Sequence, residues 1–226
     1  MRTPRVAIMV AALVLAQTIG RAQITVSYNG GSGSPNIVDS TGAVLANSIG
    51  NTVEIGYFNT GFNIAANTNN ISVLGANWHL FDSTTIRTVV GHQGSFAATS
   101  PTSFDSSFDN KTIDLWVFKT SDSLAPASDF HNVLEYGLFS STVTKTATTW
   151  PWLFPPQGTQ PPNNAPILTT SDVNATQGIF YFGNLANGGA SLQLAPVPEP
   201  STFALLGVGL VFIGIVARRS AFPAKS

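Results

Sequence analysis

Few side chains in this chain of 226 residues have the chemistry that catalysis usually requires. There are three histidines, His79, His92 and His131, and no cysteine, which excludes thiol catalysis, thiolate zinc sites and disulfides. None of the histidines stands in a His-x-x-x-His or His-Glu pair that would place two metal ligands on one helix face. No Gly-x-Ser-x-Gly motif is present. A secreted hydrolase would therefore need these histidines to converge with carboxylates in the fold, and we expect no enzyme.

Carboxylates are the second candidate group. Asp105, Asp109 and Asp114 lie close together in the sequence and could flank a site or gather calcium through oxygen ligands. The calcium-loop pattern is absent, however, and a loop rich in Asp, Asn and Ser between two strands explains them without a metal. We expect neither a metal nor a cofactor.

The C-terminal end has the features of a substrate of another enzyme. Pro198, Glu199 and Pro200 follow Ala195-Pro196-Val197, and the prolines exclude a helix interior and favour an extended chain. A peptidase can hold an extended, exposed peptide as a strand in its cleft. The segment therefore predicts a sorting and processing motif that lies between a folded domain and the residues after it.

An apolar segment follows this motif. The sixteen residues from Thr202 to Ala217 carry no charge and would form about 24 Å of helix. This falls slightly short of the usual span of about 17–25 residues, but Arg218 and Arg219 can extend to the interface and the bilayer can thin locally. We predict a single transmembrane helix, with the two arginines as a cytoplasmic stop. The alternative, a buried helix of a soluble core, would normally show a polar face.

Together these residues resemble the PEP-CTERM sorting signal of Gram-negative bacteria, from Val197 to Arg219. The resemblance rests on the order of Pro198-Glu199-Pro200, Ser201-Thr202, Leu205-Leu206-Gly207 and Arg218-Arg219. The tail of seven residues after Arg219 is longer and less basic than usual. The resemblance implies processing by an exosortase, a membrane-embedded cysteine peptidase, and association with exopolysaccharide and biofilm or floc formation.

The N-terminal residues carry a second export signal. Arg2 and Arg5 precede the apolar stretch from Val6 to Ile19, and small residues at positions 20 and 22 fit a cleavage site. We predict a signal peptide cleaved after Ala22, which leaves Gln23 as the mature N-terminus. The alternatives are a retained N-terminal anchor and a glycolipid-anchor signal at the other end, although such a signal usually ends without a basic stop.

Removing the two signals changes the charge of the remaining body. Residues 23–195 contain ten acidic residues and only four basic ones, which gives a net charge of −6. The basic residues are Arg87, Lys111, Lys119 and Lys145. Nucleic acid is therefore excluded as an expected partner, because phosphate binding needs a basic surface. Strongly acidic polysaccharides would be repelled, whereas a neutral glycan remains compatible.

An aromatic, proline-rich segment is the best candidate for ligand binding. Trp150 and Trp152 stand in Trp150–Pro156, which continues with prolines to Pro166. Aromatic faces on a stiff loop can stack on sugar rings, so these two residues predict a possible glycan-binding surface. The alternative is that the rings cover an edge of the core, as large apolar side chains usually do.

The body has the composition and periodicity of an all-β domain. Alternating or fully apolar stretches predict strands at residues 23–28, 52–58, 112–120, 133–140, 178–185 and 191–194. In the third of these, Ile113, Leu115 and Val117 should lie on one face, with Trp116 and Phe118 on the other. We expect a mainly antiparallel sandwich of jelly-roll type.

One exception to the strand pattern is the set Ile71, Leu74, Trp78 and Phe81, whose spacing fits one face of a short helix.

The predicted organisation is a signal peptide at residues 1–22, an exported domain at 23–194, and a linker, motif, transmembrane helix and tail at 195–226. Several stretches of the body resemble secreted proteins that carry the same signal and have no assigned activity: residues 37–42, 53–58, 115–118, 135–139 and 150–155. We expect a surface or matrix protein, structural or adhesive, anchored in the membrane before processing. A glycan-binding module is the second interpretation and a secreted hydrolase the third.

Overall fold

The computed structural model describes residues 24–30, 36–89, 91–101, 103, 105–144, 151–156 and 167–198. The predicted signal peptide with Ala22 and Gln23, the apolar segment after Thr202 and the stop at Arg218 and Arg219 lie outside these residues. In the described part, no helix has the length and hydropathy needed to cross a membrane.

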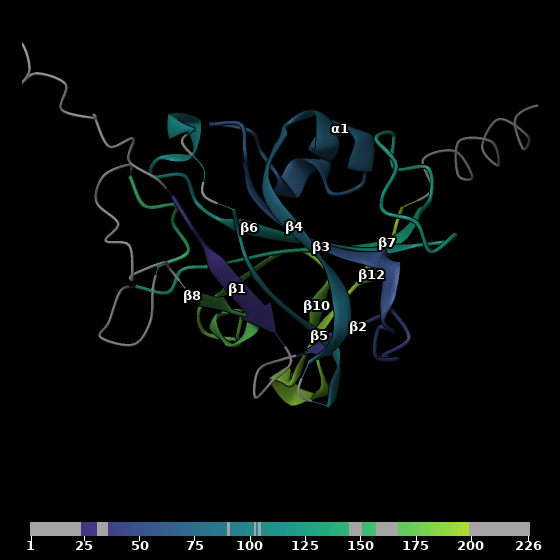
Figure 1. Ribbon diagram of the computed structural model, residues 1–226. Helices are drawn as coiled ribbons and strands as arrows, with labels where there is room; N and C mark the ends of the chain where they lie inside the picture. Colours follow the sequence, from purple (N-terminus) through teal and green to yellow (C-terminus); the bar gives the residue numbers. More distant parts are fainter. Residues whose placement is uncertain are drawn as a thin grey trace, which may run out of the picture.

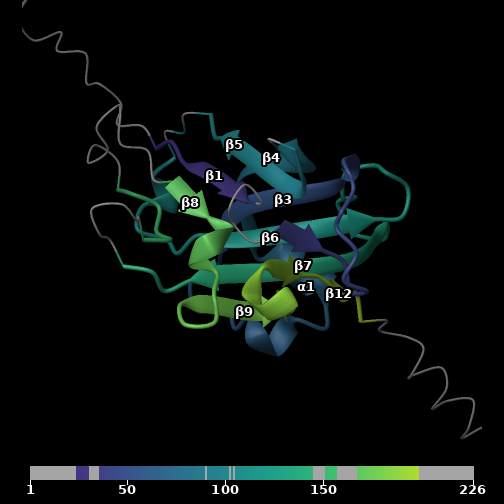
Figure 2. The same cartoon turned by 90° about the horizontal axis from the view of Figure 1, so that it is seen from below.

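The described chain is mostly β, as the sequence predicted, and it is built around one long, curled sheet (Figure 1). The order of strands is β12-β7-β6-β3-β4-β5-β1-β8, and β9 also pairs with β7. Figure 2 shows the central strands side by side. The strands of this sheet are β1 (Ser27–Gly30), β3 (Ser48–Phe58), β4 (Trp78–Val89), β5 (His92–Thr99), β6 (Asp114–Thr120), β7 (Val133–Ser141), β8 (Ile167–Thr169), β9 (Gly178–Phe182) and β12 (Ala195–Pro196).

A second, three-stranded sheet has the order β10-β11-β2 and lies on the opposite side of the long sheet from α1 (Figure 1). Its strands are β2 (Asn36–Val38), β10 (Asn184–Ala186) and β11 (Ser191–Gln193). Where a two-sheet sandwich was expected, most strands belong to one sheet that curls around its own core. Neighbouring strands in the long sheet are antiparallel except for the parallel pair β1 and β8.

The centre of the long sheet is apolar on both faces, because β3, β6 and β7 are buried on both sides. On the inner face Val53, Ile55, Leu115 and Val117 join the larger core, which the small sheet completes. The outer face carries a second core of buried residues: Phe58, Ile71, Leu74, Trp116, Phe118, Val133, Tyr136 and Leu138. The predicted division of the 112–120 strand between two faces is confirmed.

The outer core lies beneath the one α-helix of the described chain, α1 (Ile71–Ala76), where Ile71 and Leu74 are buried. The side chain of Asn70 caps its first turn by accepting a hydrogen bond from the N–H of Val73. The helix is shorter than its apolar spacing suggested, because the chain turns at Asn77 and enters β4 at Trp78. Single 3-10 turns complete the fold: η1 (Ala65–Asn67), η2 (Ser106–Phe108), η3 (Thr170–Asp172) and η4 (Asn187–Gly189).

Candidate functional site

The C-terminal end of the described chain is fixed to the edge of the long sheet. In β12, Ala195 pairs with Tyr136 and Pro196 with Glu135 of β7. The N–H of Val197 then donates a hydrogen bond of 2.9 Å to the carbonyl of Leu134. The linker that the sequence placed from Ala195 onward is therefore part of the sheet up to Val197. Pro198 comes directly after this anchor, while Glu199 and Pro200 lie outside the described residues.

An ion cluster holds the same edge. The Lys119 ammonium contacts Asp39 at 2.9 Å and Glu135 at 2.8 Å, and both carboxylates are mostly buried. Glu135 also accepts the N–H of Ser40 at 2.6 Å, so the cluster ties the turn after β2 to β6 and β7. Burial raises the pKa of Asp39, but hydrogen bonds from Thr41, Lys119 and two backbone N–H groups outweigh it and lower that pKa to about 2.

Replacing Lys119 by methionine should lower the free energy of unfolding by about 2 kcal/mol at pH 7, because two mostly buried carboxylates lose their shared cation. Urea denaturation of the full chain at pH 7 and at pH 2.5 measures this. The difference from the parent should shrink at pH 2.5, because the stabilisation that comes from the lowered pKa of Asp39 is largely lost as the pH falls towards 2. An equal loss at both pH values would show that the ion cluster is not the cause.

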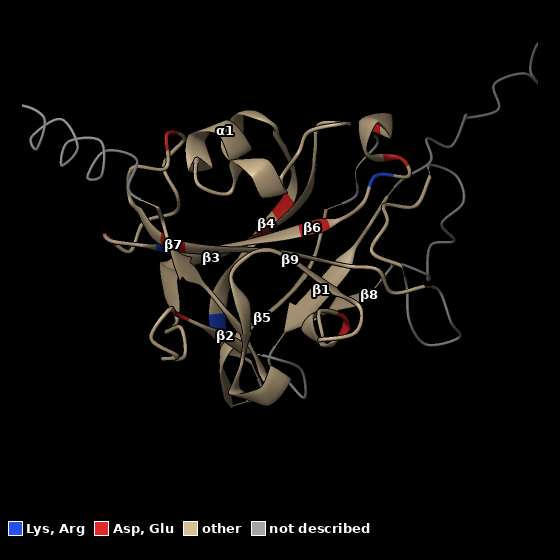
Figure 3. Cartoon of the chain, turned by 180° about the vertical axis from the view of Figure 1, so that it is seen from behind, with Lys and Arg blue, Asp and Glu red and all other residues tan. Residues whose placement is uncertain are grey.

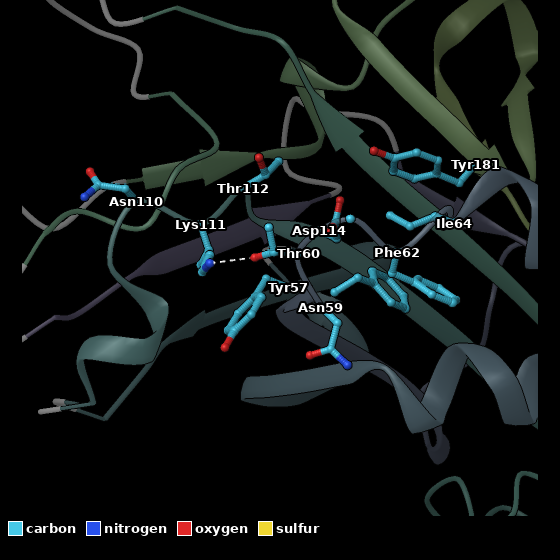
Figure 4. A pocket seen from close by; sticks show the side chains of 12 residues that line it. Tyr57, Asn59, Thr60, Phe62, Ile64, Asn110, Lys111, Thr112, Asp114 and Tyr181 are labelled. Carbon is cyan, nitrogen blue, oxygen red and sulfur yellow. Dashed lines mark hydrogen bonds between the residues drawn. The ribbon is translucent and has the colours of Figure 1, made fainter.

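A cleft of about 360 Å³ opens at the opposite end of β6 from Lys119, where β3 ends and β6 begins. Figure 4 shows Asp114 near its middle, with Lys111 and Thr60 on one side and Ile64 and Tyr181 on the other. The lining residues come from three places in the sequence: residues 57–64, residues 110–114 and β9. They are Tyr57, Phe58, Asn59, Thr60, Gly61, Phe62, Ile64, Asn110, Lys111, Thr112, Asp114 and Tyr181.

Asp114 is the most unusual residue of the cleft. It is only 3% exposed, and its Oδ1 atom is buried without a hydrogen-bond partner among the described residues. Burial raises the pKa of this carboxyl to about 7, although contact with the Ser140 hydroxyl acts in the opposite direction. The Ser140 hydroxyl itself donates to the carbonyl of Ile113 at 2.7 Å. A buried carboxylate oxygen without a donor is costly to the fold when the group is ionised.

Lys111 supplies the positive charge of the cleft. Its ammonium donates to the Thr60 hydroxyl at 2.9 Å and lies 5.6 Å from the centre of the Tyr57 ring. The ring of Tyr57 is also stacked on His79 at 4.5 Å, and His79 Nε2 lies 2.7 Å from Asn59 Oδ1. These contacts link the side chains of one wall, so Lys111 and Asn59 have defined positions at the rim.

Tyr181 reaches the cleft because β9 carries a bulge. Leu138 of β7 pairs with Phe182 and Phe139 pairs with Phe180, which leaves Tyr181 as the extra residue. In a regular strand Tyr181 and Phe182 would point to opposite faces, but here both pack on the outer core. The pKa of the Tyr181 hydroxyl is raised, first by burial and second by the charge of Asp114.

The aromatic segment that the sequence singled out has a different position. Trp152 is 3% exposed in the inner core, and its Nε1 donates to Asp172 at 3.1 Å, which fits the alternative of rings that cover the core. Its carbonyl accepts the N–H of Ile113 at 2.9 Å, and the N–H of Phe154 donates to the carbonyl of Lys111 at 2.9 Å. The segment thus supports the cleft from behind. Trp150 lies outside the described residues.

The other candidate residues do not gather in one place. His79, His92 and His131 are all exposed, on β4, at the start of β5 and before β7 respectively. Among the described residues no group of three His, Cys, Asp or Glu side chains could hold a metal ion. Asp105 instead accepts the N–H of Ser107 at the start of η2. His131 pairs with Asp129 at 2.5 Å on the surface.

Sequence reasoning named Asp114 only as one of three carboxylates and missed Lys111, Asn59 and Tyr181. The available signal was the position of Asp114 at the start of a strand that is apolar on both faces, where a charge is unexpected. Nothing local indicated that residues 57–64 and Tyr181 would be its neighbours.

Comparison with known proteins adds one finding. Residues 196–220 match the family of the PEP-CTERM protein-sorting motif. The match begins at the last residue of β12 and continues past the predicted membrane stop. The chain thus carries the signal of an exported protein that is anchored in the membrane and sorted by an exosortase. No curated protein and no solved structure matches the chain, and the expected resemblance of the body to other secreted proteins stays a prediction.

Proposed function

We propose that this protein is a structural or adhesive component of the cell surface or extracellular matrix, delivered there by exosortase processing. The sorting motif supports the route. The role in a matrix linked to exopolysaccharide and biofilm is what the resemblance to PEP-CTERM proteins implies, and the exported body, a cysteine-free β domain with a net charge of −6, is compatible with it. Figure 3 shows its few charged residues distributed over separate loops and strands.

The observation that supports the proposal best is the position of β12. The last backbone hydrogen bond of the described body is made by Val197, one residue before Pro198. A peptidase that cuts near the motif can therefore release or transfer the body without removing any paired strand from it. Conversely, the short distance from Val197 to the apolar segment at Thr202 would hold the unprocessed body within about 17 Å of the membrane, five extended residues at about 3.3 Å each.

The test is to determine the mature termini by intact mass and peptide mapping of native protein from the envelope and the medium. We expect an N-terminus at Gln23 and a C-terminus near Pro198. Replacing Glu199 by alanine, or deleting the exosortase, should abolish the processed C-terminus and leave the protein in the membrane fraction. Asp129→Asn, an exposed change outside the motif, is the matched control. Recovery of intact Ser226 in the membrane fraction of the unaltered strain would overturn the proposal.

A second candidate function is a glycan-binding module, the alternative that the aromatic segment first suggested. The cleft around Asp114 favours it, because the cleft combines polar groups with aromatic walls. Trp152 is buried and cannot be the stacking surface. If the second function holds, the binding residues differ from those that the sequence indicated.

A further inference from the structure

We propose that the cleft between Asp114, Lys111 and Tyr181 binds one neutral pyranose unit of a polysaccharide. The inference rests on the second candidate function and gives it a site and a ligand class. It assigns no sugar contact to Trp150 or Trp152, and it does not depend on the sorting motif.

Asp114 holds an unsatisfied acceptor at the cleft. Asp114 Oδ1 is buried, has no donor within the described protein and belongs to a residue that lines the cleft. An unsatisfied carboxylate oxygen at the wall of a cleft favours a ligand that brings a donor. Sugar hydroxyls are suitable donors, since a hydroxyl bonded to a carboxylate forms a strong, charge-assisted hydrogen bond.

The charge of the cleft suits a neutral ligand. Among the described lining residues there is one carboxylate, Asp114, and one ammonium, Lys111, so their charges balance. The surrounding body is acidic and repels anions at long range. Uronic acids and phosphorylated sugars are therefore poor ligands. A neutral sugar offers hydroxyls that donate to Asp114 and accept from Lys111 and the Asn110 amide.

The size of the cleft suits a small ligand. A volume of about 360 Å³ lies at the lower end of the range of ligand pockets, about 300–1,000 Å³. It suits a single ring more than a long chain. Phe62, Ile64 and Tyr181 are half-buried and line the cleft, so apolar surface is available for the carbon face of a pyranose. Asp114 lies between Lys111 and the side of the cleft that Ile64 and Tyr181 form (Figure 4).

The lining also favours binding over cleavage. Glycoside hydrolysis ordinarily uses two carboxyl groups on opposite sides of the bond. The described residues of the cleft contribute only Asp114. The site can hold a sugar by its hydroxyls, and it lacks the second carboxylate that would complete the usual reaction.

The experiment is equilibrium binding of methyl glucoside, methyl galactoside and methyl mannoside to the full chain by titration calorimetry and by NMR of the sugar. The detergent must carry a polyoxyethylene head group, because a maltoside head group is itself a sugar. At pH 8, where Asp114 is ionised, we expect at least one of these sugars to bind in the millimolar range or tighter. Glucuronate should bind at least tenfold more weakly.

Variants identify the site. Asp114→Asn and Tyr181→Ala should each weaken binding at least tenfold, whereas Asp129→Asn, a change at a carboxylate outside the cleft, should leave it unchanged. Asp114→Asn is expected to be more stable than the parent at pH 8, so a loss of binding would not come from unfolding. A thermal melt of each variant checks this.

The inference is overturned if none of the three sugars binds at 50 mM, if glucuronate binds as well as they do, or if both cleft variants bind normally. Each of these results can occur while the mature termini are as expected. Failure of the cleft and failure of the sorting proposal are therefore separate outcomes.

Discussion

Replacing Trp116 by alanine should lower the free energy of unfolding by about 3–5 kcal/mol, the largest loss that we expect from a single substitution. Trp116 is fully buried at the centre of the outer core. Its ring lies within 4.8–6.1 Å of five other rings, those of Phe58, Trp78, Phe118, Phe130 and Tyr136. Alanine would leave a cavity that these rings cannot fill without moving. Urea denaturation of the full chain, followed by tryptophan fluorescence and far-ultraviolet circular dichroism, measures the loss.

A second substitution separates packing from hydrogen bonding. The indole Nε1 of Trp116 is buried and has no hydrogen-bond partner in the part of the chain that the structure describes. Phenylalanine removes this polar group and keeps most of the apolar ring, so Trp116→Phe should cost much less than Trp116→Ala. Leu134→Ala, at a residue of β7 that is 50% exposed, is the surface control and should change stability by no more than about 0.5 kcal/mol. Equal losses for alanine and phenylalanine at position 116 would contradict this account.

Stability should reach its maximum near pH 4 and fall as the pH rises towards 8. Burial raises the pKa of Asp114 from 3.8 to about 7. It also raises the pKa of Glu54 from 4.5 to about 7, against the opposing hydrogen bond from Trp78. Between about pH 4 and pH 7 the folded chain holds protons that the unfolded chain releases, so ionisation favours unfolding. Each group contributes at most about 3–4 kcal/mol to this loss.

Below about pH 4 the effect of pH on stability is reversed, and stability falls as the pH falls. The pKa of Asp39 falls from 3.8 to about 2 in the fold, so its contribution is present above pH 3.8 and is lost as the pH falls towards 2. Midpoints of urea denaturation, measured from pH 2 to pH 9, test the expected loss of stability on both sides of pH 4.

The double variant Asp114→Asn with Glu54→Gln should flatten the curve above pH 4 and be more stable than the parent at pH 8. Lower stability of the double variant at pH 8 would show that the two carboxyls are not destabilising when ionised.

The central strands were predictable because their sequences are apolar on both faces. Trp116 and Phe118 alternate with Leu115 and Val117, so both faces of the strand are apolar. A strand of this kind is buried between two layers. By contrast, β4 was missed. Its residues are mostly polar and half-exposed. In addition, the spacing of Leu74, Trp78 and Phe81 fits one face of a helix, so the sequence predicted a helix there. Pairing with β3 and β5, which no local pattern encodes, makes this stretch a strand.

The cleft was even harder to predict from local sequence patterns than β4. Its residues come from segments more than a hundred positions apart, and they meet because β6 lies between β3 and β7, with β9 on the far side of β7. Tyr181 depends in addition on a bulge, a displacement of one residue that the sequence Phe180-Tyr181-Phe182 does not reveal. The sorting motif needed no such knowledge, since its signal is a contiguous order of residues.

The attachment of β12 also determines how the protein responds to force. Any anchor beyond Val197 pulls on the body through β12, a strand with only two paired residues, one of which is a proline without an N–H group. Under load this strand should detach first and lengthen the tether by about 10 Å, three residues at about 3.3 Å each. Resistance then passes to Leu194, whose N–H bonds to Val38, and to the buried Leu192 of β11. The edge strand thus acts as a short extensible element that takes up tension before the core does.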